Sequence, residues 1–245
     1  MAKIFRLDKF LADAGTGTRS EVKKYIQKGY VQVNGEVIRR PEFKVTEEDA
    51  VMFNGEKVGV APEFVYYILH KPAGCVSATE DSREKTVLEY IPDKRKGLFP
   101  VGRLDKDTEG LLLITDDGAL AHELLSPRKH VDKTYYARVT GKVTDDDIVK
   151  LRKGIDIGEK NLTLPANLEI LSVKETEGKW ESEIHLTICE GKFHQVKRMM
   201  EALGKKVVYL RRISMGVLTL KDDLAPGQCR PLTGTEINAL KTTKK

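Results

Sequence analysis

The stretch GRLDKDTEGLLLITDDG, residues 102–118, places a cluster of charged side chains directly before a continuous apolar run. The apolar residues 111–115 have the length and composition of a buried strand. If the preceding residues are extended, Arg103 and Asp105 lie on one face, because side chains alternate along a strand. An acid held beside a base at the start of a buried strand is typical of a cleft. A charged turn with Asp105 as its acceptor fits the same residues.

Around this stretch, apolar patterns predict more strands than helices. Continuous or alternating patterns predict strands at 64–69, 133–140, 168–173, 180–188, 207–210 and 217–220. Helical spacing predicts helices at 119–125, between Thr144 and Gly154, and at 193–203, where Phe193, Val196, Met200 and Leu203 would share a face. Because strands and helices do not alternate regularly, we expect an α+β fold with a mainly antiparallel mixed sheet flanked by helices, rather than a doubly wound fold.

Residues 4–58 predict a small separate module of two helices and a hairpin sheet. The apolar residues of 7–14 recur at helical spacing. Residues 18–21, Thr-Arg-Ser-Glu, form a capping box that would begin a second helix. The pairs Asn34-Gly35 and Asn54-Gly55 each suit a two-residue hairpin turn.

A short segment without periodicity, residues 59–63, follows this module. We therefore place a domain boundary there and expect domains at 1–59 and 60–245. The chain has 245 residues, which is enough for two domains with a sizeable core. Its composition, 40% hydrophobic and 32% charged, is that of an ordinary globular protein.

The sequence contains no recognisable targeting, membrane or metal-binding pattern. No apolar run approaches the roughly 18 residues needed to cross a bilayer, and the N-terminal residues MAKIFRLDKF have no apolar signal core. We therefore expect a cytoplasmic protein with no membrane partner. Cys75, Cys189 and Cys229 are far apart and odd in number, and the five histidines are scattered. Neither a disulfide framework nor a metal site is expected from them.

Positive charge is concentrated in two parts of the chain. Residues 1–45 contain ten basic and five acidic residues, and residues 190–212 contain seven basic and two acidic ones. Since the formal net charge of the whole chain is +5, the other residues carry a net charge of −5. This segregation favours a polyanionic partner touched at two places, although solvated basic helix faces would give the same counts.

The segment RLDKFLADAGTGTRSEVKKYIQKGYVQVNGEVIRRPEFKV, residues 6–45, resembles the S4 RNA-binding domain, and the resemblance extends over roughly residues 4–58. It implies an RNA-binding face lined by Arg6, Lys9, Thr18, Arg19, Ser20, Lys23 and Lys24. Cations on such a face neutralise phosphates, so the affinity falls as salt is added. S4 domains occur in ribosomal proteins, tyrosyl-tRNA synthetases and modification enzymes, so this module does not by itself name an activity.

Residues 64–220 resemble the S4-containing RNA pseudouridine synthases of the RsuA type. The matching pieces are LHKPAGCVSAT (69–79), residues 102–118, KTYYARV (133–139) and EGKFHQVKRMMEALGKKVVYLRRISMG (190–216). The resemblance implies that the second domain breaks the N1–C1′ glycosidic bond of uridine, turns the detached base and joins C5 to C1′. No atoms are gained or lost, so no cofactor is expected.

By this resemblance Asp105 is the catalytic aspartate. The ribose C1′ becomes electron-poor as the glycosidic bond breaks, and an ionised carboxylate can stabilise that charge, attack C1′ or remove the C2′ proton. The residues alone do not choose between these roles. Asp107 and Glu109 are alternatives on chemistry alone, and the motif match favours Asp105.

The same resemblance gives Asp105 a basic partner and an aromatic neighbour. Lys197 stands at the family's basic position in HQVKRM and would pair with Asp105; a bond to Glu201, one helical turn on, is the alternative. Tyr135 matches the family tyrosine, which would stack on the uracil and assist removal of the C5 proton. A buried strand tyrosine is the alternative, and Tyr136 is its neighbour and competitor.

Four arginines are expected to have RNA-binding or base-flipping roles, Arg103 by resemblance and the other three because of their charge. Arg103, in the G-R-L-D string, would enter the base stack where the target nucleotide leaves it, because unstacking is costly; a structural ion pair is its alternative. We expect RNA phosphates to be held by Arg198, Arg211 and Arg212. The alternative for these three residues is that they belong to a solvated basic face.

Together these features predict a monomeric, cytoplasmic enzyme that isomerises one uridine of ribosomal RNA within an assembling small subunit. Lysine rather than arginine at position 197 and the short C-terminal tail favour 16S rRNA as the substrate. A 23S rRNA enzyme of the same family is one alternative. A non-catalytic S4-type assembly factor is another, and it predicts a decayed G-R-L-D string, which this chain does not have.

Overall fold

A computed structural model describes residues 4–59, 64–93, 95–126 and 129–242. The chain divides into two compact units, Met1–Glu63 and Phe64–Lys245. The predicted boundary between residues 59 and 60 falls at the edge of the segment 60–63, which lies outside the described residues, and it stays a prediction.

The first unit is a small α+β module, as its sequence patterns predict. Its elements are β1 (Ile4–Arg6), α1 (Leu7–Asp13), α2 (Arg19–Lys28), β2 (Val31–Val33), β3 (Glu36–Val37), β4 (Lys44–Thr46), β5 (Val51–Phe53) and β6 (Glu56–Val58). Strands β3-β2-β5-β6 form one sheet, and β1 pairs with β4. The capping box at Thr18 and Glu21 is confirmed, and Gly29 ends α2 in the left-handed conformation (φ 85°).

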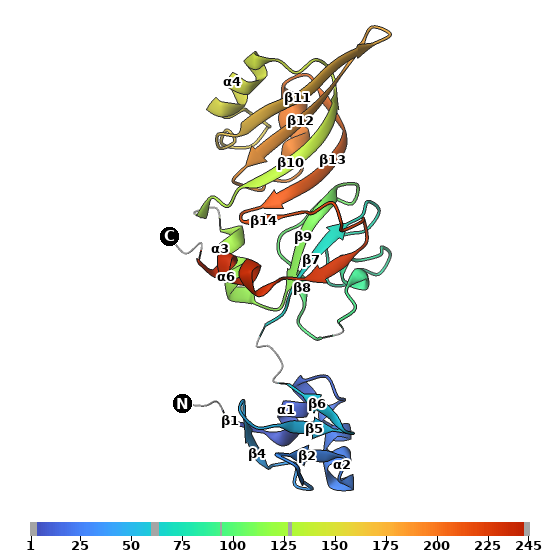
Figure 1. The fold of residues 1–245 in the computed structure, drawn as a ribbon. Helices are drawn as coiled ribbons and strands as arrows, with labels where there is room; N and C mark the ends of the chain where they lie inside the picture. The colour runs from blue at the N-terminus through green and yellow to red at the C-terminus, as the bar shows by residue number, and fades with distance from the viewer. Residues whose placement is uncertain (1–3, 60–63, 94, 127–128, 243–245) are drawn as a thin grey trace. The chain divides into compact units, whose positions relative to one another are not determined.

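The second unit is built on a nine-stranded sheet (Figure 1). Seven of the strands follow one another in the order β11-β12-β10-β13-β9-β7-β15, and the other two, β14 and β8, pair with β13 and β9. Its elements are β7 (Tyr66–Lys71), η1 (Val87–Tyr90), β8 (Phe99–Pro100), β9 (Glu109–Thr115), α3 (Gly118–Leu125), β10 (Lys133–Thr140), α4 (Asp145–Lys153), β11 (Asn167–Thr176), β12 (Lys179–Ile188), α5 (Gln195–Ala202), β13 (Lys206–Met215), β14 (Leu218–Thr219), β15 (Cys229–Pro231) and α6 (Gly234–Thr242). Helix α4 packs against β11 and α5 against β13. The α+β prediction is confirmed.

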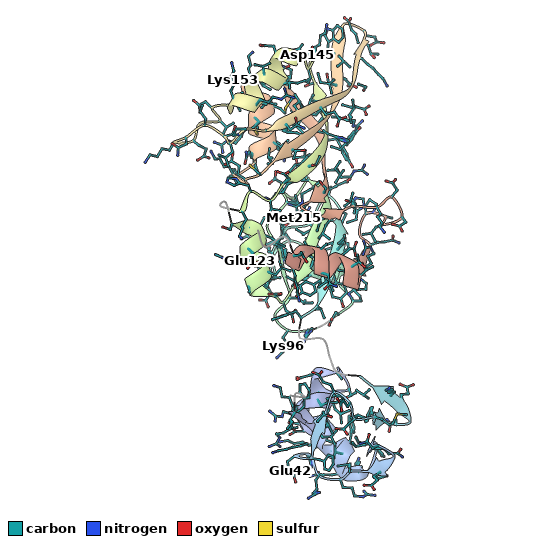
Figure 2. All side chains as sticks on the ribbon, turned by 60° about the vertical axis from the view of Figure 1, so that its left-hand side comes forward. Glu42, Lys96, Glu123, Asp145, Lys153 and Met215 are labelled. Atoms are coloured by element: carbon teal, nitrogen blue, oxygen red, sulfur yellow. The ribbon has the colours of Figure 1, made fainter. Side chains whose placement is uncertain are left out.

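The sheet has two halves that meet at a short parallel pairing. Strand β9 pairs with β13 only through Glu109 with Arg211 and Gly110 with Arg212, whereas the other ladders of this sheet are antiparallel. Gly110 has φ +110°, and a Cβ atom there would overlap the Arg212 backbone. The glycine of the T-E-G-L-L string therefore allows the two halves to join, because a side chain at this position would collide with β13. Met215 lies near the meeting of the two halves (Figure 2).

The structure corrects two predictions near this junction. The strand predicted at 207–210 is part of the longer β13, which continues to Met215. The helix predicted at 193–203 begins only at Gln195, because His194 adopts a left-handed conformation (φ 50°). Phe193 is consequently not on the buried face of that helix; it is 74% exposed. Helix α6 and the 3-10 turn η1 were not predicted, and within the described residues no helix is long and apolar enough to span a membrane.

Candidate active site

Two adjoining cavities, of about 570 Å³ and about 80 Å³, open where the two halves of the sheet meet. They share Arg103, Leu104, Asp105 and Tyr135 in their linings, and Lys197 lines the smaller one. The four side chains predicted to be catalytic, Arg103, Asp105, Tyr135 and Lys197, therefore surround one hollow although they come from segments far apart in the sequence.

The loop that carries Asp105 is held in place by its backbone. Lys71, at the end of β7, is fully buried. Its Nζ atom donates to three backbone carbonyl oxygens, those of Pro72 (3.0 Å), Lys106 (3.3 Å) and Thr108 (2.9 Å). On the other side, the Ser77 hydroxyl donates to the Leu104 carbonyl (2.9 Å) and accepts from the Leu104 amide (3.1 Å). The backbone is thus pinned both before and after Asp105.

Lys71 was missed by the sequence analysis, although it stands in the quoted string LHKPAG. Burial lowers the pKa of Lys71, while nearby acidic groups, Cys75, Asp107 and Asp105 among them, oppose that effect. A lysine that follows an apolar strand and precedes a proline was the available signal. Nothing local shows, however, which carbonyl groups such a side chain will reach.

Lys197, on α5, bridges two carboxylates of this loop. Its Nζ atom lies 3.0 Å from Oδ2 of Asp105 and 2.7 Å from Oδ1 of Asp107. Burial lowers the pKa of Lys197, but its hydrogen bonds to Asp107 and Asp105 outweigh burial and raise it overall. The Lys197 hydrogen bond in turn lowers the pKa of Asp107. The predicted pairing with Asp105 is present, and the alternative bond to Glu201 is not the one this ammonium makes.

His194 is a second neighbour of Asp105 that the sequence analysis missed. Its Nε2 atom lies 3.5 Å from Oδ1 of Asp105, on the opposite carboxylate oxygen from Lys197. The left-handed backbone at His194 directs the side chain there immediately before α5 begins. In the sequence, His194 is only one of five scattered histidines. Its partner Asp105 is 89 positions away in the chain, so no local pattern connects the two residues.

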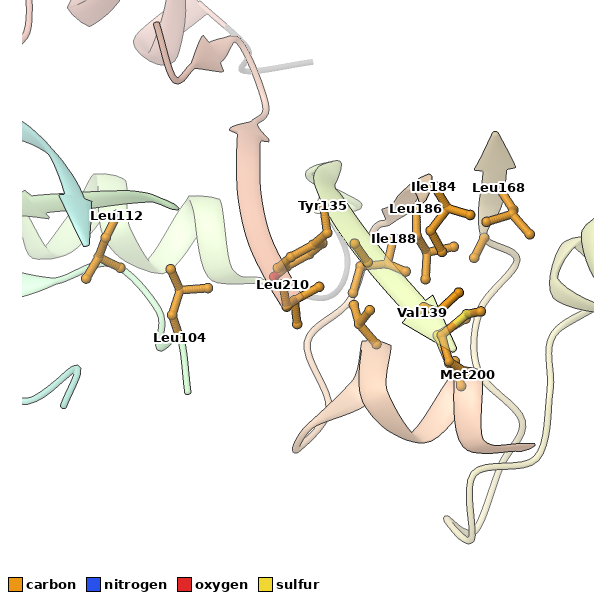
Figure 3. Packing of buried hydrophobic residues seen from close by; sticks show 14 of the residues in the cluster. Leu104, Leu112, Tyr135, Val139, Leu168, Ile184, Leu186, Ile188, Met200 and Leu210 are labelled. Carbon is orange, nitrogen blue, oxygen red and sulfur yellow. The ribbon is translucent and has the colours of Figure 1, made fainter. Parts of the chain in front are cut away.

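Tyr135 brings an aromatic ring to the same hollow. It stands on β10 and is 8% exposed, and its ring packs in the core cluster that includes Leu104 and Leu210 (Figure 3). No hydrogen bond from its hydroxyl to a described residue is present. Tyr136 faces the other side of the sheet, where its hydroxyl donates to Glu183 (2.9 Å). The choice between the two tyrosines is therefore decided in favour of Tyr135 as the one that lines the cavities.

Arg103 lies at the rim with its side chain exposed. It forms no ion pair or hydrogen bond with any residue of the described segments. The alternative reading of Arg103 as a member of a structural ion pair is therefore not supported. Its guanidinium is available to a ligand at the mouth of the cavities.

Two buried cations line the larger cavity. Arg212 is 2% exposed, and its Nε donates to the Leu111 carbonyl oxygen (2.8 Å) while its Nη2 is buried without a hydrogen-bond partner. Lys133 donates to the Val131 carbonyl oxygen (2.8 Å), and burial together with the charge of Arg212 lowers the pKa of Lys133. The burial of Arg212 excludes the alternative that it belongs to a solvated basic face. Lys133 was not predicted to be a site residue.

The other two arginines are engaged with the protein. Arg198 donates to Glu159 (2.7 Å), to the carbonyl oxygen of Phe193 (3.0 Å) and to that of Ile157. The guanidinium of Arg211 lies 5.7 Å from the centre of the Tyr136 ring. Their predicted phosphate contacts stay predictions, and Arg198, which is on α5, connects this helix to Glu159 and to the backbone at Phe193 and Ile157.

A second charged cluster lies on the first unit. Asp8 is fully buried, and it accepts from Arg6 Nη2 (3.1 Å) and Arg19 Nε (3.4 Å). Burial raises the pKa of Asp8, but the hydrogen bonds and charges of the two arginines outweigh burial and lower it overall. The seven residues of the predicted RNA-binding face are all exposed: Arg6, Lys9, Thr18, Arg19, Ser20, Lys23 and Lys24. Asp8 was not among the predicted residues.

The described side chains contain no group of three or more His, Cys, Asp or Glu residues that could hold a metal ion. At the cavities, the Asp105 carboxylate is flanked by an ammonium and an imidazole, and a tyrosine ring and a free guanidinium lie in the same lining.

One unit has an exposed basic face, and the other has a carboxylate in a cavity. This combination is typical of an enzyme that modifies RNA. Comparison with known proteins defines the class further. Residues 65–202 match the family model described as RNA pseudouridylate synthase, and residues 5–51 match the S4 domain. The chain belongs to the RNA pseudouridylate synthase family and carries an S4 domain, so it is an RNA uridine isomerase.

Individual relatives cover nearly the whole chain. An uncharacterized RNA pseudouridine synthase YtzG of Bacillus subtilis (strain 168) is 45% identical over 238 residues, which are 96% of this chain and 98% of the relative. Ribosomal small subunit pseudouridine synthase A of Escherichia coli (strain K12) is 41% identical over 234 residues, 95% of this chain and 98% of the relative. A crystal structure of a pseudouridylate synthase matches with a TM-score of 0.66 at 39% identity, covering 96% and 99% of the two chains.

Proposed function

We propose that this enzyme converts one uridine of 16S ribosomal RNA to pseudouridine, with Asp105 as the catalytic carboxylate. The observation that carries the proposal is the placement of Asp105, Tyr135 and Lys197 around one cavity. Relatives named for the small ribosomal subunit, which align over almost the entire chain, support the choice of substrate.

Asp105 meets the ribose of a uridine that has left the base stack. As the N1–C1′ bond breaks, positive charge develops at C1′, and the carboxylate stabilises that charge, attacks C1′ or removes the C2′ proton. Lys197 and His194 hold the two carboxylate oxygens in a defined orientation. The detached uracil turns, C5 bonds to C1′, the C5 proton leaves, and N1 takes up a proton, so atoms balance without a cofactor.

Tyr135 and Arg103 act on the base. The Tyr135 ring stacks on the uracil, and its hydroxyl, which no described residue engages, is positioned to assist transfer of the C5 proton. Arg103 occupies the space that the uridine leaves, which offsets part of the few kcal/mol that unstacking costs. The free guanidinium of Arg103 supports this role, since a residue already held in an ion pair would have to break it first.

The first unit contributes affinity. Arg6, Arg19 and the three lysines of the predicted RNA-binding face neutralise phosphates of the ribosomal RNA. We propose in addition that the enzyme acts as a monomer in the cytoplasm, on a small subunit that is still being assembled, when the target uridine is accessible.

The experiment that tests the proposal maps pseudouridines after the purified enzyme is incubated with unmodified 16S and 23S rRNA fragments. We expect a single new pseudouridine, in the 16S fragments, with wild-type protein and none with Asp105→Asn. A pseudouridine found only in 23S rRNA would overturn the proposed substrate. Full turnover by Asp105→Asn would overturn the role of the aspartate.

A further inference from the structure

Phe193 is a large apolar side chain in an unusual position. It is 74% exposed, more than any other exposed large hydrophobic residue described, and it lines the larger cavity. Its ring lies against the His194 imidazole, with ring centres 3.8 Å apart and planes inclined by 19°. One face of the Phe193 ring is therefore covered by His194 while the residue as a whole stays open to solvent.

This pair of stacked rings is connected to the proposed catalytic carboxylate. His194 lies 3.5 Å from Asp105 through its Nε2 atom. The Phe193 ring is thus separated from the carboxylate by a single imidazole, at the mouth of the cavity. Its 74% exposure leaves ring surface open to a ligand at this place.

The segment that carries the two rings is braced from several directions. Arg198 donates to the Phe193 carbonyl oxygen (3.0 Å). The Lys192 amide donates to Oε1 of Gln195 (2.8 Å), and Gln195, which is buried, donates in turn to Glu190 (2.8 Å). These bonds fix the backbone on both sides of the rings, so the rings are presented in a prearranged position, which reduces the entropy lost on binding.

The chemistry around the rings selects the class of ligand. Lys192 and Arg103 line the larger cavity together with Phe193, and Lys197 lines the adjoining smaller cavity. These positive charges attract a polyanionic strand to the mouth of the cavities. Exposed aromatic rings among basic side chains are the usual platform for unpaired bases, because every base has a π-face to stack. Tyr135, inside the cavity, already serves the target uracil, which leaves the outer rings for a different base.

We propose that Phe193 and His194 form a preformed stacking shelf for the unpaired nucleobase next to the target uridine in the RNA strand. The proposal rests on the proposed function, since it needs an RNA strand at the Asp105 cavity. The shelf holds the neighbouring nucleotide while the uridine is everted.

The test uses an RNA oligonucleotide that contains the mapped uridine, with 2-aminopurine placed as its 5′ or 3′ neighbour. Stacking on the shelf quenches 2-aminopurine fluorescence. We expect quenching by wild-type protein and by Phe193→Tyr, which keeps the ring, but not by Phe193→Leu. The affinity of Phe193→Leu for this RNA should fall about tenfold, equivalent to about 1.4 kcal/mol, and KM should rise by a larger factor than kcat falls.

A matched control and a modified RNA make the result specific. Val149→Ala removes another exposed apolar side chain, on α4 and outside the cavities, and should change neither affinity nor quenching. With an abasic nucleotide in place of the neighbouring base, Phe193→Leu and wild type should bind equally well.

Three outcomes would overturn the shelf: equal quenching by Phe193→Leu and wild type, an equal loss with Phe193→Tyr, or an undiminished effect of Phe193→Leu on the abasic RNA. Pseudouridine formation by the wild type is measured on the unmodified oligonucleotide. A failure of the proposed function is therefore seen as absent turnover, while a failure of the shelf is seen as turnover that does not depend on the ring at position 193.

Discussion

The two charged clusters of the molecule use the same kinds of side chain in opposite arrangements. On the first unit, Asp8 is fully buried and holds two half-exposed guanidiniums, those of Arg6 and Arg19. On the second unit, the ammonium of Lys197 pairs with two carboxylates; its side chain is 21% exposed, against 26% for Asp105 and 73% for Asp107. The shared group of each cluster is here called the inner group, and its two partners are the outer groups.

In the proposed function, this difference separates binding from catalysis. Exposed cations anchored by a buried acid form a surface that attracts phosphates without reading or changing them. A carboxylate paired with a cation beside a cavity can act on a carbon atom that becomes electron-poor. Substitution of an inner group should therefore disturb the outer ones, whereas substitution of an outer group should remove a function with less effect on stability.

The largest effect is expected at the outer carboxylate of the second unit. Asp105→Asn removes the charge with little change in volume, so we expect turnover to fall about 1,000-fold or more while RNA affinity changes less than about twofold. Single-turnover pseudouridine assays and a filter-binding titration measure the two quantities. Asp107→Asn is the matched control, because it removes the other carboxylate bound to Lys197, and it should keep most of the activity.

A smaller loss is expected when the inner cation of that cluster is removed. Lys197→Met leaves Asp105 and Asp107 side by side without the ammonium between them, and the pKa of Asp107 loses the hydrogen bond that lowers it. We expect about a 100-fold lower rate at neutral pH, because Asp105 loses the ammonium that orients it. Lys197→Arg, which restores the charge, should recover part of the rate; an unchanged rate for Lys197→Met would contradict the anchor role.

Removal of the inner acid of the first unit should weaken RNA binding without stopping catalysis. Asp8→Asn leaves Arg6 and Arg19 without their common anchor, so we expect a few-fold weaker RNA binding and a free energy of unfolding lower by about 2 kcal/mol. Equilibrium titration and urea unfolding of the full chain are the measurements. Asp13→Asn, on the exposed side of α1, is a control that should change neither.

The contribution of Asp8 to stability depends on pH in a defined direction. The pKa of Asp8 is lowered in the folded protein from a value of 3.8. Its stabilising effect is therefore complete above pH 3.8 and is lost as the pH falls through the lower, folded-state pKa. The difference in unfolding free energy between wild type and Asp8→Asn should be constant near neutral pH and shrink below that value; a difference that grew on acidification would contradict the lowered pKa.

The smallest effect is expected for two outer cations of the first unit. Arg19→Ala combined with Lys23→Ala removes two phosphate contacts, so the slope of log affinity against log salt should decrease by about 2, with a few-fold loss of affinity at physiological salt. Turnover at saturating RNA should not change. An unchanged salt slope would place the RNA-binding face on other residues.

Much of the fold could be predicted from local patterns. The capping box of residues 18–21, the Asn-Gly turns and the alternating strand from Lys133 to Thr140 were all confirmed, because each depends on residues a few positions apart. The helix predicted to include Phe193 was wrong in its first turn, since helical spacing of apolar residues does not reveal a left-handed backbone at His194.

The candidate site was predicted less evenly. Asp105, Tyr135, Lys197 and Arg103 were recognised from strings of sequence that resemble a family, and they line one cavity. The supporting residues Lys71, His194, Lys133 and Asp8 were missed. Lys71 and His194 act through partners far away in the sequence. The burial of Lys133 and Asp8 is recognisable only when their surroundings are known.

By itself the sequence determined the local elements, the division into an S4-like part and a larger part, and the family to which the motifs point, since periodicity, caps and turns are properties of neighbouring residues. Tertiary structure alone decided that β9 joins β13 through Gly110, that Tyr135 rather than Tyr136 faces the cavity, and which charges are inner and which are outer. Burial and long-range pairing depend on segments that meet only after the chain has folded, so the physical basis of these choices lies in three-dimensional contacts.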